Sequence, residues 1–245
     1  MTTLSDTLYD TFSLLLQLDV NLWGIILLSL KVSGTALFFA VIVGLPIALG
    51  LTLRRFPGER LLYIIVDTMM ALPPVVVGLV VYLLLSRSGP LGVWGLLYTP
   101  TAMIIAQTLL ITPIVIALAL PLLKNHWSRI GEQLMVLGYR PWQILPTLLH
   151  EARAGIMTVI LAAFGRGIAE IGAVMIVGGN IDQHTRVMTT TIAMETQQGN
   201  LALALALGIV LIMIALIINS GAHMINAKMS ANIGVKYNRN ARGLR

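Results

Sequence analysis

Two oppositely charged residues, Arg166 and Glu170, lie one helical turn apart inside a long apolar run of the sequence. At this spacing they share one face of a helix and can form an ion pair. Ionisable side chains are costly in apolar surroundings, so the pair must face protein or water. Two roles follow. In one, Arg166 offers a positive charge to a passing oxyanion while Glu170 orients the arginine. In the other, the two charges only neutralise each other and attach the helix to a neighbouring helix.

Other patterns that could support chemistry are incomplete. Residues 165–172 approach a GxGxxG dinucleotide fingerprint, but Glu170 stands in the place of the last glycine and no strand precedes it. His150 and Glu151 begin like the zinc motif HExxH, but Ala154 stands where the second histidine would be. The sequence also lacks a GxxxxGK(S/T) phosphate loop. We therefore predict no metal site, no catalytic residue, no cofactor and no ATP hydrolysis on this chain.

The composition is typical of a polytopic membrane protein. Of the 245 residues 57% are hydrophobic and 11% are charged, and the mean hydropathy is +0.89. Several apolar runs exceed the roughly 20 residues that a helix needs to cross a bilayer. The isoelectric point near 10 does not indicate nucleic-acid binding, because the basic residues are dispersed at the ends of apolar runs. Cysteine is absent, which excludes disulfides.

The apolar runs predict an all-α protein with five membrane spans. Residues 1–20 place apolar side chains at helical spacing, which predicts an interfacial helix. A transmembrane domain follows over residues 21–227, and residues 228–245 form a basic tail. The predicted spans cover residues 22–53, 61–85, 101–123, 148–177 and 201–225, and Pro73 and Pro74 break the second of them.

The positive charges predict how these spans cross the membrane. Most of the 16 Lys and Arg residues lie after the first span, after the third span, and in the C-terminal tail. These segments fall on one side of a five-span arrangement, which the positive-inside rule assigns to the cytoplasm. We therefore expect the N-terminus outside, the C-terminus in the cytoplasm, and residues 124–147 as a cytoplasmic connection.

This connection resembles the coupling motif of ABC-importer permeases, in which a short helix docks on a separate ATPase subunit. The resemblance depends on Glu132 and on Gly138 six residues later. Gln133 and Leu134 replace the two alanines of the usual motif. The resemblance assigns ATPase coupling to Glu132, Gln133, Leu137, Gly138 and Arg140. The alternative is that Glu132 only caps or solvates its helix.

Three longer stretches resemble the permease subunit of tungstate ABC importers, relatives of the molybdate and sulfate permeases. They are HEARAGI (150–156), FGRGIAEIGAVMIVGGNI (164–181) and TRVMTTTIAMETQQGNLALALALGI (185–209). The resemblance implies a type I ABC importer transmembrane domain in the inner membrane of a bacterial cell. It also implies a homodimer, cytoplasmic ATPase subunits that hold ATP and Mg, an extracytoplasmic substrate-binding protein, and oxyanion import by alternating access.

The resemblance leaves site residues and alternatives to be tested. Within the same class, the alternative is a molybdate or sulfate permease. A self-sufficient secondary transporter would couple ions through acidic groups such as Asp67 and would show inverted repeats, but no repeat is visible. For the outer loop after residue 180, simple solvation is the alternative to a binding-protein contact. The path candidates are Arg166, Glu170 and Asn180, and the binding-protein contact candidates are Arg186, Thr189 and Thr190.

Overall fold

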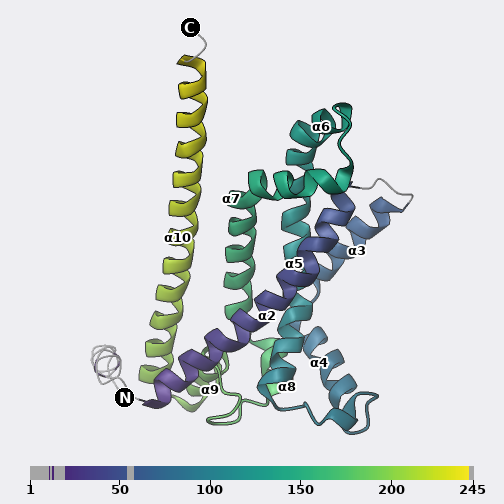
Figure 1. The fold of residues 1–245 in the computed structure, drawn as a ribbon. Helices are drawn as coiled ribbons and strands as arrows, with labels where there is room; N and C mark the ends of the chain where they lie inside the picture. The colour runs from purple at the N-terminus through teal and green to yellow at the C-terminus, as the bar shows by residue number, and fades with distance from the viewer. Residues whose placement is uncertain (1–10, 12, 14–19, 54–57, 243–245) are drawn as a thin grey trace.

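The computed structural model describes residues 11, 13, 20–53 and 58–242 (Figure 1). Every regular element within these residues is a helix, which confirms the predicted all-α class. The interfacial helix predicted over residues 1–20 lies almost entirely outside the described part of the chain. The elements are α2 (Val20–Leu53), α3 (Glu59–Ala71), α4 (Pro74–Leu85), η1 (Gly92–Trp94), α5 (Pro100–His126), η2 (Trp127–Gly131), α6 (Glu132–Val136), α7 (Pro141–Ile168), α8 (Gly172–Gly178), α9 (Met188–Gln198) and α10 (Leu201–Arg242).

The structure has four or five candidate membrane spans where the sequence predicted five. Among the described residues, four helical segments are long and apolar enough to cross a membrane, and the bent pair α3 and α4 makes a fifth if it counts as one span. The bend between α3 and α4 is 93°. Pro73 and Pro74 explain it, because they carry no N–H group and cannot continue the hydrogen bonds of α3. The four unbent segments are Asn21–Leu53, Pro100–Val136, Pro141–Ile168 and Leu201–Gly221.

The fourth predicted span is not the single run that we expected over residues 148–177. Helix α7 begins earlier, at Pro141, and ends at Ile168, while α8 begins only at Gly172. No proline marks this break. Glu170 stabilises it instead, because its Oε1 accepts a hydrogen bond from the Ala173 N–H (3.3 Å) and so satisfies the start of α8. Residues 169–171 therefore form a polar joint between α7 and α8, the two halves of this span.

Small residues set the closest contacts between spans. Gly44 of α2 faces α5, where an added Cβ would lie 3.1 Å from a Val115 methyl carbon. Gly78 of α4 lies so close to α8 that an added Cβ would be 2.6 Å from the Ala173 Cα. Such residues let helix backbones approach closely, and this packing holds helices together in lipid. The two broken spans are thus packed against each other along α4 and α8.

The two ends of the molecule carry different elements. Figure 1 shows α6 and the last turns of α10 at one end, with α8, α9 and the start of α2 at the other. The helical segment Pro100–Val136 has 37 residues. At 1.5 Å per residue it is about 55 Å long, well beyond the roughly 30 Å of a hydrocarbon core, so it is long enough for its C-terminal part, α6, to extend beyond the membrane. Which end faces the cytoplasm stays a prediction.

Candidate functional site

A short turn of helix at the protruding end brings the predicted coupling residues together. Helix α6 begins at Glu132, as predicted, but continues from η2 without a break, and it closes at Gly138 with a Schellman motif. The Tyr139 N–H donates to the Leu134 carbonyl oxygen (3.1 Å) and the Gly138 N–H to that of Met135 (3.0 Å). Gly138 has φ +87°, a left-handed conformation in which a side chain is strained. The glycine of the motif is therefore required by backbone geometry.

The same turn exposes apolar side chains. We call Glu132, Gln133, Leu137, Gly138 and Arg140 the coupling surface, and all five are exposed. Beside them Val136 is 87% exposed, and Tyr139 and Trp142 are also exposed. Where such a segment lies outside the membrane, contiguous exposed apolar side chains mark a site of contact with another protein. The surface therefore has the composition of a docking site.

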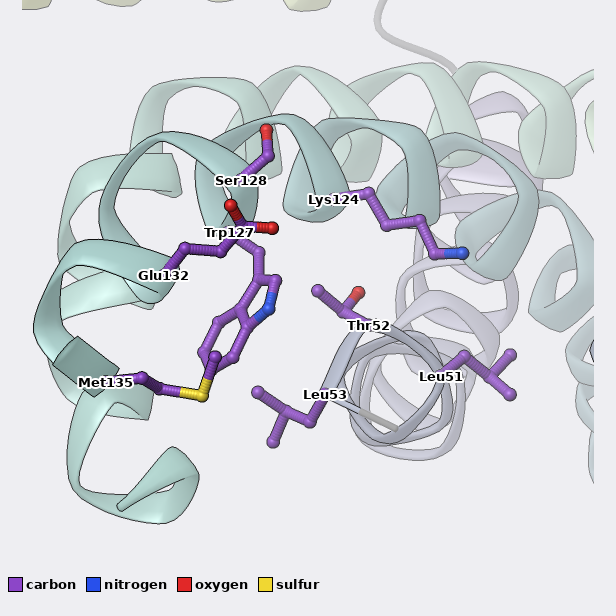
Figure 2. Close-up of a pocket in the computed structure, with 8 residues that line it drawn as sticks. All are labelled: Leu51, Thr52, Leu53, Lys124, Trp127, Ser128, Glu132 and Met135. Carbon is purple, nitrogen blue, oxygen red and sulfur yellow. The ribbon is translucent and has the colours of Figure 1, made fainter. Parts of the chain in front are cut away.

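A cavity of about 520 Å³ separates the coupling surface from the end of α2. Figure 2 shows the Trp127 indole in this cavity, facing Thr52 and Leu53. The ring packs on Gly131, where an added Cβ would lie only 2.5 Å from the ring carbon Cδ2. The residue pattern did not predict this contact, although the tryptophan and glycine are one helical turn apart. The cavity is lined by Leu51, Thr52, Leu53, Lys124, Trp127, Ser128, Glu132 and Met135.

The predicted ion pair in the fourth span is present, and its two members lie in different surroundings. Arg166 Nη1 is 3.1 Å from Glu170 Oε2, and the side chains are 51% and 6% exposed, respectively. The buried carboxylate also accepts the hydrogen bond that starts α8. In the described part of the chain, the guanidinium has Glu170 as its one hydrogen-bond partner. The remaining donors of the guanidinium make no hydrogen bond to a described residue, although half of the Arg166 side chain is exposed.

A residue that the sequence analysis did not single out completes this polar joint. Gln107 of α5 is buried, and its Nε2 donates to the Gly167 carbonyl oxygen at 3.0 Å. Its Oε1 is buried without a partner. Two cavities of about 10 Å³ flank the carboxamide, one shared with Arg166 and the other with Ser29 and Ser33. A glutamine in an otherwise apolar run was the available signal.

Arg166, Glu170 and Gln107 together form what we call the Arg166 site. Asn180 and Arg186 lie in the loop after α8, separate from this site. Asn180 follows α8 with φ +50° and donates from Nδ2 to the Met194 sulfur at 3.2 Å. It lines neither cavity beside Gln107, so the structure does not bring it to Arg166 and Glu170. Arg186 pairs with Asp182 at 3.0 Å and lines a separate cavity of about 360 Å³ at the N-terminal end of α2.

Thr189 and Thr190, predicted as binding-protein contacts, are buried in this structure. The Thr189 hydroxyl donates to the Glu170 carbonyl oxygen at 2.8 Å, and the Thr190 hydroxyl accepts from the Val187 N–H at 3.1 Å. Backbone groups freed at breaks in membrane helices need such internal partners. In this conformation the hydroxyls satisfy the chain around α9, so Arg186 alone of the three candidates remains partly accessible.

Comparison with known proteins assigns this architecture to a family. The family of binding-protein-dependent transport system inner membrane components matches residues 36–231. A solved structure of the MetNI methionine ABC transporter in inward-facing conformations has the same fold, with a TM-score of 0.65 at 18% identity, covering 84% of this chain and 94% of that one.

Two curated relatives cover most of the chain. The tungstate uptake system permease protein TupB of Peptoclostridium acidaminophilum is 44% identical over 84% of this chain and 91% of its own. The sulfate transport system permease protein CysT of Escherichia coli (strain K12) is 30% identical over 75% of this chain and 69% of its own. Both relatives are permease components rather than enzymes. The chain therefore belongs to the family of binding-protein-dependent transport system inner membrane components, the permeases of ABC transporters.

Proposed function

We propose that this chain is the permease subunit of an ATP-driven importer that carries an oxyanion, with tungstate the favoured substrate. The observation that carries the proposal is the half-exposed side chain of Arg166 within a segment long and apolar enough to span a membrane. A charge at this depth is stable only if it faces protein or a water-filled path. Its free donors suit a tetrahedral oxyanion, since guanidinium groups bind oxyanions through paired charge-assisted hydrogen bonds.

The substrate assignment is supported by the relatives. The chain is more similar to the tungstate permease TupB than to the sulfate permease CysT. Sulfate or molybdate remains the alternative substrate, because these oxyanions share the charge and shape of tungstate. In either case Arg166 supplies a positive charge along the translocation path, and Glu170 holds the arginine in place. Asn180 lines the path nearer the outer end.

The coupling surface connects this chain to ATP hydrolysis on a separate subunit. Leu137 of this surface and the exposed Val136, Tyr139 and Trp142 beside it fit a groove on a cytoplasmic ATPase subunit, which would hold ATP and Mg. Two copies of the chain enclose the path between them, and closure of the ATPase pair moves both coupling surfaces together. The attached spans then open the path alternately outward and inward. A substrate-binding protein delivers the oxyanion at the outer end, where Arg186 lies.

Purification of the tagged chain from a native membrane tests the complex. We expect an ATPase subunit to co-purify in equal amount, together with a second, differently tagged copy of this chain. Vesicles containing the complex should take up tungstate only when ATP and the binding protein are both supplied. Tungstate uptake without ATP, or a purified chain without an ATPase partner, would contradict the proposal.

A further inference from the structure

Three side chains join α3 to α5 near the end of the molecule that carries α6. Glu59 begins α3, and its carboxylate forms an ion pair with the ammonium of Lys124 in the last turn of α5. The Tyr63 hydroxyl donates to the same carboxylate oxygen at 2.9 Å. Lys124 Nζ also lies 4.7 Å from the centre of the Tyr63 ring, a cation–π contact. We call this cluster the α3–α5 clamp.

The clamp is joined to the coupling surface by continuous helix. From Lys124 the helix runs through η2 into α6 and reaches Glu132 without a break. The eight intervening steps correspond to about 12 Å at 1.5 Å per residue. Lys124 and Glu132 also line the same cavity, with the Trp127 ring between their helical turns (Figure 2). Because the helix is continuous, a rigid displacement of α6 would also displace Lys124.

The other end of α3 reaches the Arg166 site. Met70 and Leu72 line the small cavity that Arg166, Glu170 and Gln107 share. Helix α3 has 13 residues, so about 18 Å separates Glu59 from its last residue. The 93° bend that follows separates α3 from α4. Helix α3 is thus a short rigid element with the clamp at its start and the Arg166 site at its end.

We propose that Glu59 and Lys124 are positioning residues that transmit movement of the coupling surface to the Arg166 site through α3. This inference rests on the proposed function, which supplies the ATPase that moves the coupling surface. The ion pair suits such a role because its side chains are 38% (Lys124) and 21% (Glu59) exposed, so solvent screens it less than a fully exposed pair. Loss of either charge removes the ion pair between α3 and α5, so a displacement of α5 is no longer passed fully to α3.

A first test needs neither ATP nor substrate. The chain contains no cysteine, so Leu61→Cys and Asn125→Cys can carry spin labels on α3 and α5 in the full chain in lipid nanodiscs. We expect one narrow distribution of distances between the labels, and a broadened one when Glu59→Gln is added. The charge swap Glu59→Lys with Lys124→Glu should restore the narrow distribution. An equally narrow distribution with Glu59→Gln would overturn the proposal.

A second test measures the number of oxyanions transported per ATP hydrolysed by the reconstituted complex. We expect Glu59→Gln to lower this ratio about fivefold, the effect of losing one partly buried ion pair, and the charge swap to recover most of it. A purely structural role would lower ATP hydrolysis and transport together and leave the ratio unchanged, which would overturn the proposal. Glu151→Gln, at an exposed carboxylate of α7, is the matched control.

The two tests separate failure of this inference from failure of the proposed function. If the wild-type complex transports no oxyanion, the proposed function is wrong, whatever the spin labels report. If the wild-type complex transports tungstate and the label distances are insensitive to Glu59→Gln, the proposed function stands and the clamp does not transmit movement.

Discussion

Gln107 donates a hydrogen bond to the Gly167 carbonyl oxygen at 3.0 Å, immediately before the joint between α7 and α8. On the other side of the joint, the Glu170 carboxylate accepts from the Ala173 N–H and from Arg166. The Thr189 hydroxyl satisfies the Glu170 carbonyl oxygen. A broken helix in a membrane needs such partners, and here each comes from a different element. The residues that hold the joint, Glu170 and Gln107, therefore also form the Arg166 site.

Replacing the glutamine tests how much this bond contributes. Gln107→Met keeps the size of the side chain but removes the donor to Gly167, which we expect to cost about 1 kcal/mol of stability. The measurement is thermal unfolding of the purified chain in one detergent. Gln197→Met, at an exposed glutamine of α9, should leave the unfolding temperature unchanged. Equal unfolding temperatures for the two variants would contradict this account of the joint.

Arg166→Lys tests whether the guanidinium recognises the substrate. Lysine keeps the positive charge but loses the planar set of donors, so we expect tungstate transport to fall about tenfold. Arg153→Lys, at an exposed arginine of α7, is the control for the same change of side chain. Near-normal transport by Arg166→Lys, at equal amounts of protein in the membrane, would show that the ion pair only stabilises the span.

Gly138→Ala tests the backbone of the coupling surface. Its φ of +87° disfavours any side chain, and the change should cost about 1–2 kcal/mol in the turn that closes α6. We therefore expect less ATPase subunit to co-purify with the variant. Gly208→Ala is the control, because an added Cβ meets nothing within 4 Å there. If both variants retain the same amount of ATPase, the turn is not part of the docking site.

Gly131→Ala tests the packing of Trp127 below the coupling surface. The added methyl group would lie 2.5 Å from the indole, and such overpacking costs about 1–3 kcal/mol. The loss should shrink when Trp127→Leu is combined with it, because the clashing ring is then gone. Thermal unfolding of the two single variants and the double variant gives the interaction energy. Additive losses would contradict this contact.

The sequence predicted the features that depend on neighbours along the chain. The i, i+4 spacing was enough to pair Arg166 with Glu170, and Pro73 and Pro74 marked the bend between α3 and α4. Glu132 was correctly placed at the start of α6.

The remaining features depend on contacts between distant segments. Gln107 supports the joint from 60 positions away, and Lys124 meets Glu59 across 65 positions. The run from Ile168 to Val177 is apolar except for Glu170, so its periodicity favoured one continuous helix. Thr189 was predicted as a binding-protein contact from its place in a polar loop. Its hydroxyl is buried instead, because it satisfies the Glu170 carbonyl group, which becomes free at a joint that the sequence did not predict.

Elemental analysis tests most directly whether the chain admits tungstate to the cell. Tungsten and molybdenum are measured by mass spectrometry in cells lacking this chain, in cells with it restored, and in cells carrying Arg166→Lys, all supplied with trace amounts of both oxyanions. The account predicts loss of tungsten with molybdenum retained, recovery on restoration, and poor recovery with Arg166→Lys. Loss of molybdenum alone, or unchanged tungsten in cells lacking the chain, would contradict it.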